Sequence, residues 1–124
     1  MANEGKTHLN YVIICPEEHV EEGNRIFRSH REWMERTHPR SGPAALLSYA
    51  VSRGPELANL LDPGSEKTGN MCYVLAEVYE SDAGVANHFA EAQSSWEDFG
   101  ALGEWLGKCK MYGSPQAPII NSLW

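Results

Sequence analysis

The segment from Glu77 to Ala92, EVYESDAGVANHFAEA, holds the two residues with the clearest potential for chemistry. A histidine has an ordinary pKa near ~6.5, so a neutral imidazole at His88 can accept a proton from a phenol close to neutral pH. The alternative is that His88 packs beside Phe89 at the edge of a core and has no chemical role.

Glu77 interrupts the apolar segment Met71 to Tyr79, whose residue types are typical of a buried strand. An isolated buried carboxylate is costly, so Glu77 must be paired, protonated or hydrated. Arg53, on the preceding predicted strand, is a candidate partner. A structural ion pair and a catalytic acid both remain open at this point.

The other histidines and the cysteines do not have the spacing of a metal site. The five histidines form no HxH, HxxxH or HExxH pattern, and Cys15, Cys72 and Cys109 form no CxxC pair. We therefore expect no metal and no cofactor. His30 is expected to be a buried core or interface histidine on the apolar face of a helix over 17–37. The cysteines are expected to be reduced and buried.

The hydrophobic pattern predicts the elements that would hold these residues. Runs rich in β-branched and aromatic residues predict strands over 8–15, 44–53 and 71–79, with one or two short strands over 110–113 and 119–123. Apolar residues at three- and four-residue steps predict helices over 17–37 and from Ser81 or Asp82 to 106, the second bent or divided near Trp96. Residues 54–70 are expected to form a long connection, either a lid or a mobile insertion.

The order strand, helix, strand, strand, helix, strand is that of the α+β, ferredoxin-like split βαβ fold with a four-stranded antiparallel sheet. Strands 8–15 and 71–79 are apolar at both alternating positions, so both faces of the sheet must be covered. The small residues of strand 71–79 are expected beneath the helices: Cys72, Val74, Ala76 and Val78. A second copy is the simplest cover for the other face. We therefore expect a homodimer, a dimeric α/β barrel, with the C-terminal IINSLW lying across the partner.

Composition and charge narrow the classes of partner. The 124 residues are expected to form a single domain, 1–124. The net charge of −7 repels phosphate backbones and anionic lipids, so no nucleic acid and no membrane is expected as a partner. The segment MANEGKTHLN lacks the pattern of a secretory signal, and no apolar run approaches the ~18 residues of a membrane span. A cytoplasmic location is the resulting expectation.

The segment LAEVYESDAGVANHF, Leu75 to Phe89, resembles the signature of the antibiotic biosynthesis monooxygenase family in the dimeric α+β barrel superfamily. There the third strand ends in a Glu-Val-Tyr or similar triplet, and the following helix carries a histidine. The resemblance implies a homodimer that binds a small aromatic or apolar ligand between sheet and helices. It implies, for some members, oxidation of quinols or polyphenols by oxygen without metal or flavin. The matching positions are His88 and, more loosely, Asn10 and Trp96.

The candidate site therefore has two groups of residues. His88 is the candidate base, with Asn10 and Glu77 as further catalytic candidates. The candidate ligand-binding residues are aromatic: Tyr49, Tyr73, Trp96 and Phe99. Trp96 and Phe99 lie at helical spacing, where such residues are more often plain core.

Two functions remain open for this chain, and a third, haem degradation, is disfavoured. Haem-degrading members of the superfamily resemble this chain at Asn10, but His88 stands where their tryptophan would be, and Trp96 and Asp98 downstream are not accompanied by a histidine. The first function is cofactor-independent oxidation of a quinol or polyphenol. The second is a non-catalytic, ligand-binding or stress-associated dimer of the same fold.

Overall fold

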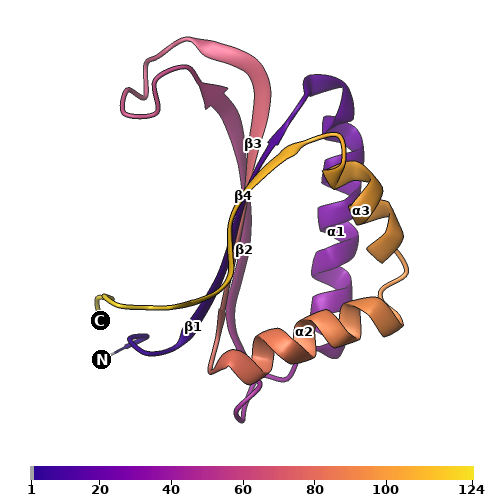
Figure 1. Cartoon of the computed structure of the whole chain (residues 1–124), viewed down its shortest axis with the longest axis vertical. Helices are drawn as coiled ribbons and strands as arrows, with labels where there is room; N and C mark the ends of the chain where they lie inside the picture. The colour runs from indigo at the N-terminus through magenta and orange to yellow at the C-terminus, as the bar shows by residue number, and fades with distance from the viewer. Residues whose placement is uncertain (1) are drawn as a thin grey trace.

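The computed structural model describes residues 2–124 and has an α+β architecture in which one curved sheet carries its helices on a single face (Figure 1). The elements follow in chain order: β1 (Thr7–Cys15), the short 3-10 helix η1 (Glu17–His19), α1 (Val20–Thr37), β2 (Leu46–Leu57), β3 (Lys67–Tyr79), α2 (Asp82–Ser95), α3 (Phe99–Leu106) and β4 (Lys110–Pro118).

The sheet has the strand order β2-β3-β1-β4, and every neighbouring pair is antiparallel. This is the arrangement of the ferredoxin-like, split βαβ fold that the element order predicts. The central pair, β1 and β3, is regular along its whole length, from Thr7 opposite Tyr79 to Cys15 opposite Met71. That regularity fixes which side chains share a face, because alternate residues of a strand point to opposite sides.

The first helix packs on the sheet through a continuous buried stripe. Its buried residues recur at three- and four-residue steps, as the sequence pattern predicts: Gly23, Ile26, Phe27, His30, Trp33 and Met34. The second predicted helix is divided into α2 and α3 at Trp96, and the Ser81 side chain caps α2 by accepting from the Ala83 amide. The sequence therefore predicts both the start of α2 at Ser81 and the division at Trp96.

The predicted assignment of the two sheet faces is wrong. The large side chains of β3 lie beneath the helices and are almost fully buried: Tyr73, Leu75, Glu77 and Tyr79. The small side chains lie on the face without helices: Cys72, Val74, Ala76 and Val78. The physical reason is that the small residues that permit close packing are on the helices. Gly23 of α1 lies against the Tyr73 hydroxyl of β3 as well as the Trp105 ring of α3, and Gly84 of α2 lies against the Tyr79 ring of β3.

The predicted 54–70 connection is also wrong in its boundaries, because β2 continues to Leu57 and β3 begins at Lys67. Only residues 58–66 connect the two strands. The long hairpin curls away from the helices, towards the open face of the sheet (Figure 1). It is therefore no lid over the space between sheet and helices.

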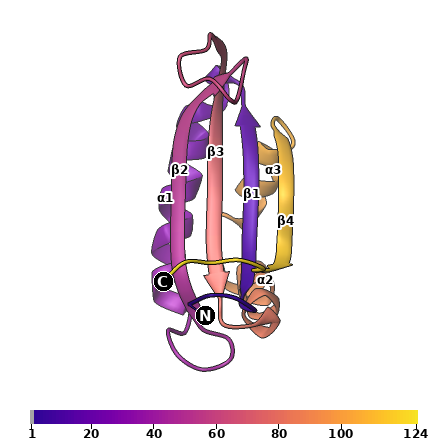
Figure 2. The ribbon, with the colours of Figure 1, turned by 90° about the vertical axis from the view of Figure 1, so that its left-hand side faces the viewer.

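The C-terminal part forms one strand, β4, rather than one or two short strands separated by SPQAP. Its prolines are tolerated because β4 is an edge strand, and Gly113, with φ 124°, lies beside an irregularity in its register with β1. Residues 119–124 then cross the open face of the chain's own sheet (Figure 2). At the start of this segment the Ile119 carbonyl accepts a hydrogen bond from the Gly5 amide, and the Ile119 amide donates to the Lys6 carbonyl.

Replacing Gly23 by alanine tests the close approach of α1 to its neighbours. A Cβ there would lie 2.5 Å from the Trp105 ring and 2.9 Å from the Tyr73 hydroxyl. We expect the free energy of unfolding in urea to fall by about 2 kcal/mol. Gly100→Ala in α3 is the matched control, since a Cβ at that position meets nothing within 4 Å; it should preserve stability or raise it by up to about 1 kcal/mol. Equal stability of the two variants would contradict this packing.

Candidate functional site

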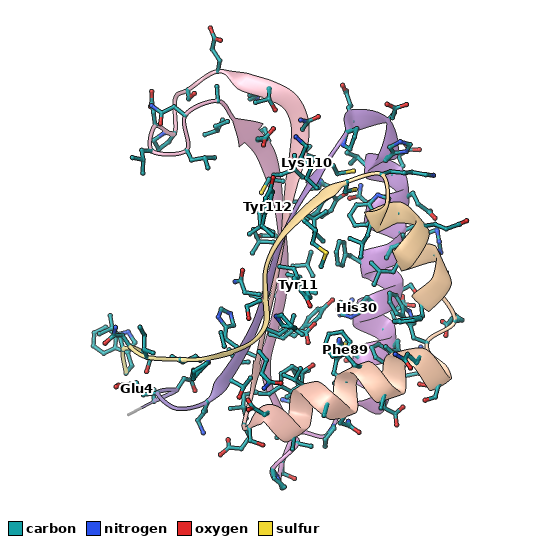
Figure 3. The ribbon with its side chains drawn as sticks, viewed as in Figure 1. Glu4, Tyr11, His30, Phe89, Lys110 and Tyr112 are labelled. Atoms are coloured by element: carbon teal, nitrogen blue, oxygen red, sulfur yellow. The ribbon has the colours of Figure 1, made fainter. Side chains whose placement is uncertain are left out.

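An apolar pocket of about 230 Å³ lies between the sheet and the three helices. Aliphatic and aromatic side chains from β1, β3, β4 and all three helices line it, and His30 and His88 contribute its imidazoles. Figure 3 labels Tyr11, His30 and Phe89 where β1, α1 and α2 approach one another. An apolar cavity of ~150 Å³ can hold benzene, so this pocket has room for a small aromatic molecule.

Trp96 forms the pocket wall at the break between α2 and α3. Its indole N–H donates to the Ser29 hydroxyl at 3.0 Å, and its ring stacks on Trp33 with centroids 5.6 Å apart. The indole N–H of Trp33 donates to the Ser95 hydroxyl, also at 3.0 Å. Both indole donors are therefore satisfied, which fixes the two rings and the helix break beside the pocket.

A chain of hydrogen bonds determines the protonation of His88. Thr37 Oγ1 donates its only proton to the Trp33 carbonyl at 2.8 Å, so at 2.9 Å from His38 Nδ1 it must accept. His38 is neutral because burial lowers its pKa, so its Nε2 carries a lone pair. That atom lies 2.9 Å from His88 Nδ1, which must be the donor. A neutral His88 with its proton on Nδ1 has an unprotonated Nε2.

Glu77 lies beside His88 and is completely buried. Its Oε1 accepts a hydrogen bond from the Tyr79 hydroxyl and lies 3.8 Å from His88 Nδ1. Its Oε2 is the buried side-chain oxygen in residues 2–124 that has no hydrogen-bond partner. A buried, unsatisfied acceptor of this kind costs about 1–3 kcal/mol, so the position calls for an explanation.

Burial favours the neutral forms of these groups. Removal from water raises the pKa of Glu77 to about 7, although the Tyr79 hydrogen bond acts in the opposite direction. Removal from water also lowers the pKa of His88 to about 3, and the repulsion that His88 and His38 would exert on each other if both were protonated adds to this. The contact between Glu77 and His88 is therefore not an ion pair at neutral pH, because the imidazole is uncharged.

His30 faces the same cluster from α1. Its Nδ1 lies 2.9 Å from the Tyr49 hydroxyl, and its ring is 5.6 Å from the His88 ring. Burial lowers the pKa of His30 to about 3, so this imidazole is also neutral. One nitrogen of His30, one of His88 and one oxygen of Glu77 lie within 4.8 Å of one another. These three are the side chains, among residues 2–124, that could together hold a metal ion.

The structure brings together some of the predicted site residues and separates others. His88, Trp96 and Phe99 line the pocket, with Glu77 behind His88. Asn10 lies on the opposite face of the sheet, because its neighbours Leu9 and Tyr11 face the helices.

The two predicted tyrosines have other contacts. Tyr73 ties β3 to α1, because its single hydroxyl proton lies between two acceptors, the Val20 carbonyl at 3.0 Å and Asn24 Oδ1 at 2.6 Å. Tyr49 contacts His30 from β2 and lines a separate surface depression instead of the inner pocket. Neither side chain lines the pocket.

Arg53 does not pair with Glu77, so that hypothesis is wrong. The register places Arg53 opposite Tyr73 and places Tyr49 opposite Glu77. Among the described residues, His88 is the group that comes within ion-pair distance of Glu77. The carboxylate therefore lacks the guanidinium partner that the sequence suggested.

Three site residues were missed at the level of sequence. His38 contacts His88 across 50 positions of the chain, so no local pattern could reveal the pair. His30 was expected in the core, but its place in the pocket wall depends on the packing of α1. Tyr79 could have been found, since it lies two residues after Glu77 and therefore on the same face of the strand.

Comparison with known proteins shows no relative: no protein-family model, no curated protein and no solved structure matches this chain. None of the helices in residues 2–124 combines the length and hydropathy that crossing a membrane requires. The function is therefore inferred from the geometry of the site.

Glu77→Gln tests the burial of this carboxyl group through the pH dependence of stability. The folded pKa, about 7, lies above the ordinary 4.5. The contribution of the protonated group is therefore fully present below about pH 4.5 and is lost as pH rises through 7. We expect the unfolding free energy of the wild type, relative to the variant, to fall by about 3 kcal/mol between these limits. Glu66→Gln, at an exposed position, is the control and should show no such trend. A parallel pH profile of wild type and Glu77→Gln would contradict the assigned burial.

Proposed function

We propose that this protein binds a small aromatic molecule with a hydroxyl group in the pocket between sheet and helices, and that His88 accepts the hydroxyl proton. The observation that carries the proposal is the unprotonated Nε2 of His88 in the wall of an apolar pocket. A pocket with apolar walls and few polar groups is typical of small-molecule sites.

The pocket matches a flat, apolar ligand. Phe89 of α2, Trp96 between the two helices and Phe99 of α3 supply aromatic surface, and Tyr11 of β1 lies on the opposite wall. Aromatic rings contact one another favourably in stacked and edge-to-face arrangements. The imidazoles are the groups that would orient a hydroxyl on such a molecule.

The proposed reaction is oxidation of a quinol or polyphenol by oxygen. His88 takes one proton from the quinol, and the anion passes one electron to O₂, giving a semiquinone radical and superoxide. The semiquinone then gives its electron and its remaining proton to superoxide, and the His88 imidazolium returns the proton it took, so quinol and O₂ become quinone and hydrogen peroxide. Glu77 behind His88 favours the imidazolium formed in the first step, because an ionised carboxylate at 3.8 Å attracts a positive charge.

The assembly proposed for this function is a homodimer of the monooxygenase-like barrel type, working in the cytoplasm. The motif from Leu75 to Phe89 supports the family. The open sheet face supports the dimer, because half-buried apolar residues lie there with no helix over them: Val12, Ile14, Val74 and Val78. The three free cysteines suit a reducing compartment.

Two observations favour a non-catalytic, ligand-binding function as the second candidate. The pKa of about 3 makes His88 a weak base. Asn10 is absent from the pocket because it lies on the other face of the sheet. In this alternative the same pocket binds the aromatic molecule without oxidising it.

Filling the pocket tests ligand binding itself. Ala92 is buried and lines the pocket, whereas Ala90 is exposed on the same helix. We expect Ala92→Leu to weaken binding of 1-naphthol at least tenfold, because the added side chain occupies the ligand's volume. Ala90→Leu should bind like the wild type. Binding is followed by quenching of tryptophan fluorescence, and unchanged affinity in Ala92→Leu would place the ligand elsewhere.

Replacing His88 tests catalysis. We expect His88→Ala to abolish oxygen uptake with 1,4-dihydroxynaphthalene, after subtraction of the protein-free rate, while the melting temperature stays within a few degrees. His88→Gln is a second variant in case the alanine variant is unstable, since its amide can still donate to His38. Equal uptake by wild type and both variants would exclude His88 as the base. Binding without uptake in the wild type would favour the non-catalytic candidate.

A further inference from the structure

We propose that His30, Glu77 and His88 form a binding site for a divalent transition-metal ion of the zinc or iron(II) type. The residues come from α1, β3 and α2, and their side chains meet between the sheet and the helices. This goes beyond the proposed function, which needs no metal. It also departs from the sequence, in which no histidine spacing indicates a metal.

The geometry is close to that of a three-ligand site. One donor atom from each residue lies within 4.8 Å of the other two. A metal about 2.1 Å from each ligand requires these atoms to lie within about 4.2 Å of one another. Coordination of one ion by all three residues would therefore require the most widely separated donor atoms to approach one another by about 0.6 Å. The three residues are 4 %, 0 % and 5 % exposed, so the ion would be shielded from bulk water.

The unpartnered oxygen of Glu77 is independent evidence for a cation site at this position. Tyr79 satisfies Oε1, but Oε2 is fully buried with no partner in residues 2–124. No arginine or lysine of the described chain lies within ion-pair distance of this carboxylate. A cation bound at Oε2 would both satisfy the oxygen and balance its charge.

The histidines are held as metal-ligating histidines usually are. In such sites one ring nitrogen binds the metal while the other is fixed by a hydrogen bond. His88 donates from Nδ1 to His38, and His30 Nδ1 is bonded to the Tyr49 hydroxyl. Within residues 2–124 the Nε2 atoms of both rings have no hydrogen-bond partner. The lone pair of His88 Nε2 is available at neutral pH.

The donor set selects the class of metal. Imidazole nitrogen favours zinc, iron, nickel and copper over calcium and magnesium, which prefer oxygen ligands. Two imidazoles and one carboxylate also leave at least one coordination position open. The three protein ligands carry a total charge of −1, so a divalent ion leaves +1. An anionic fourth ligand, such as hydroxide or an ionised phenol, would offset that charge.

A bound metal and the proposed proton transfer are alternatives at the same atom. An ion bound at His88 Nε2 would occupy the lone pair that the proposed function assigns to the base. Loading with Zn²⁺ is therefore expected to suppress cofactor-independent oxygen uptake. Absence of metal binding would leave the oxygen-uptake test of His88 unaffected, so the two proposals fail separately.

Cobalt(II) absorption tests the site on the full chain. Protein freed of metal with a chelator and then dialysed is titrated with Co²⁺, and visible d–d bands are expected to saturate at one ion per chain. The near-ultraviolet band of a sulfur ligand should be absent, because the proposed ligands include no cysteine. Added Zn²⁺ should displace the cobalt and raise the melting temperature. Absence of saturable d–d bands, or the presence of the sulfur band, would overturn the proposal.

Matched variants show whether these residues are the ligands. Glu77→Gln keeps the shape of the side chain and removes its charge, and we expect it to weaken Co²⁺ binding at least tenfold while remaining folded. His30→Gln and His88→Gln should do the same. The double variant His8→Gln, His19→Gln removes two histidines outside the cluster and should bind like the wild type. Binding that survives in Glu77→Gln, or is lost in the double variant, would contradict the assignment.

Discussion

The burial of Glu77 is the constraint on which the rest of this structure depends. A carboxyl group with no exposed surface lies at the centre of the interface between sheet and helices. Its neighbours explain why it is tolerated: the Tyr79 hydroxyl donates to one oxygen, and burial raises its pKa to about 7, so the neutral form is accessible near neutral pH. The second oxygen remains unpartnered. A purely structural core would avoid such a group, so its presence beside His88 is an argument for chemistry at this position.

The two faces of the sheet have different roles in this account. The helix-covered face holds large side chains, and the glycines that allow close packing lie on α1 and α2. This arrangement leaves an apolar pocket with imidazoles in its wall. The open face holds small apolar side chains, with the hairpin of β2 and β3 curling towards it and the C-terminal residues crossing it (Figures 1 and 2). Its incomplete cover is the physical reason for proposing a second copy there.

Local patterns in the sequence predicted much of the fold but only part of the site. Helical periodicity located α1 and the division at Trp96, and residue types located β1 and the core of β3. Alternation along β3 separates two sets of side chains, but it does not say which set the helices cover, and that choice was wrong. The contact of His38 with His88 spans 50 positions and depends on the tertiary fold. Local patterns do not determine strand register either, and it is the register that places Arg53 opposite Tyr73 rather than opposite Glu77.

The most direct test of this account is the tautomer of His88, because both the proton transfer and the metal site require an unprotonated Nε2. Long-range ¹H–¹⁵N correlation NMR on labelled, metal-free protein distinguishes the two neutral forms of a histidine and its cation. The hydrogen bonds from Trp33 through Thr37 and His38 predict that at neutral pH His88 is uncharged and carries its proton on Nδ1. A proton on Nε2, or titration near the ordinary value of about 6.5, would contradict the account.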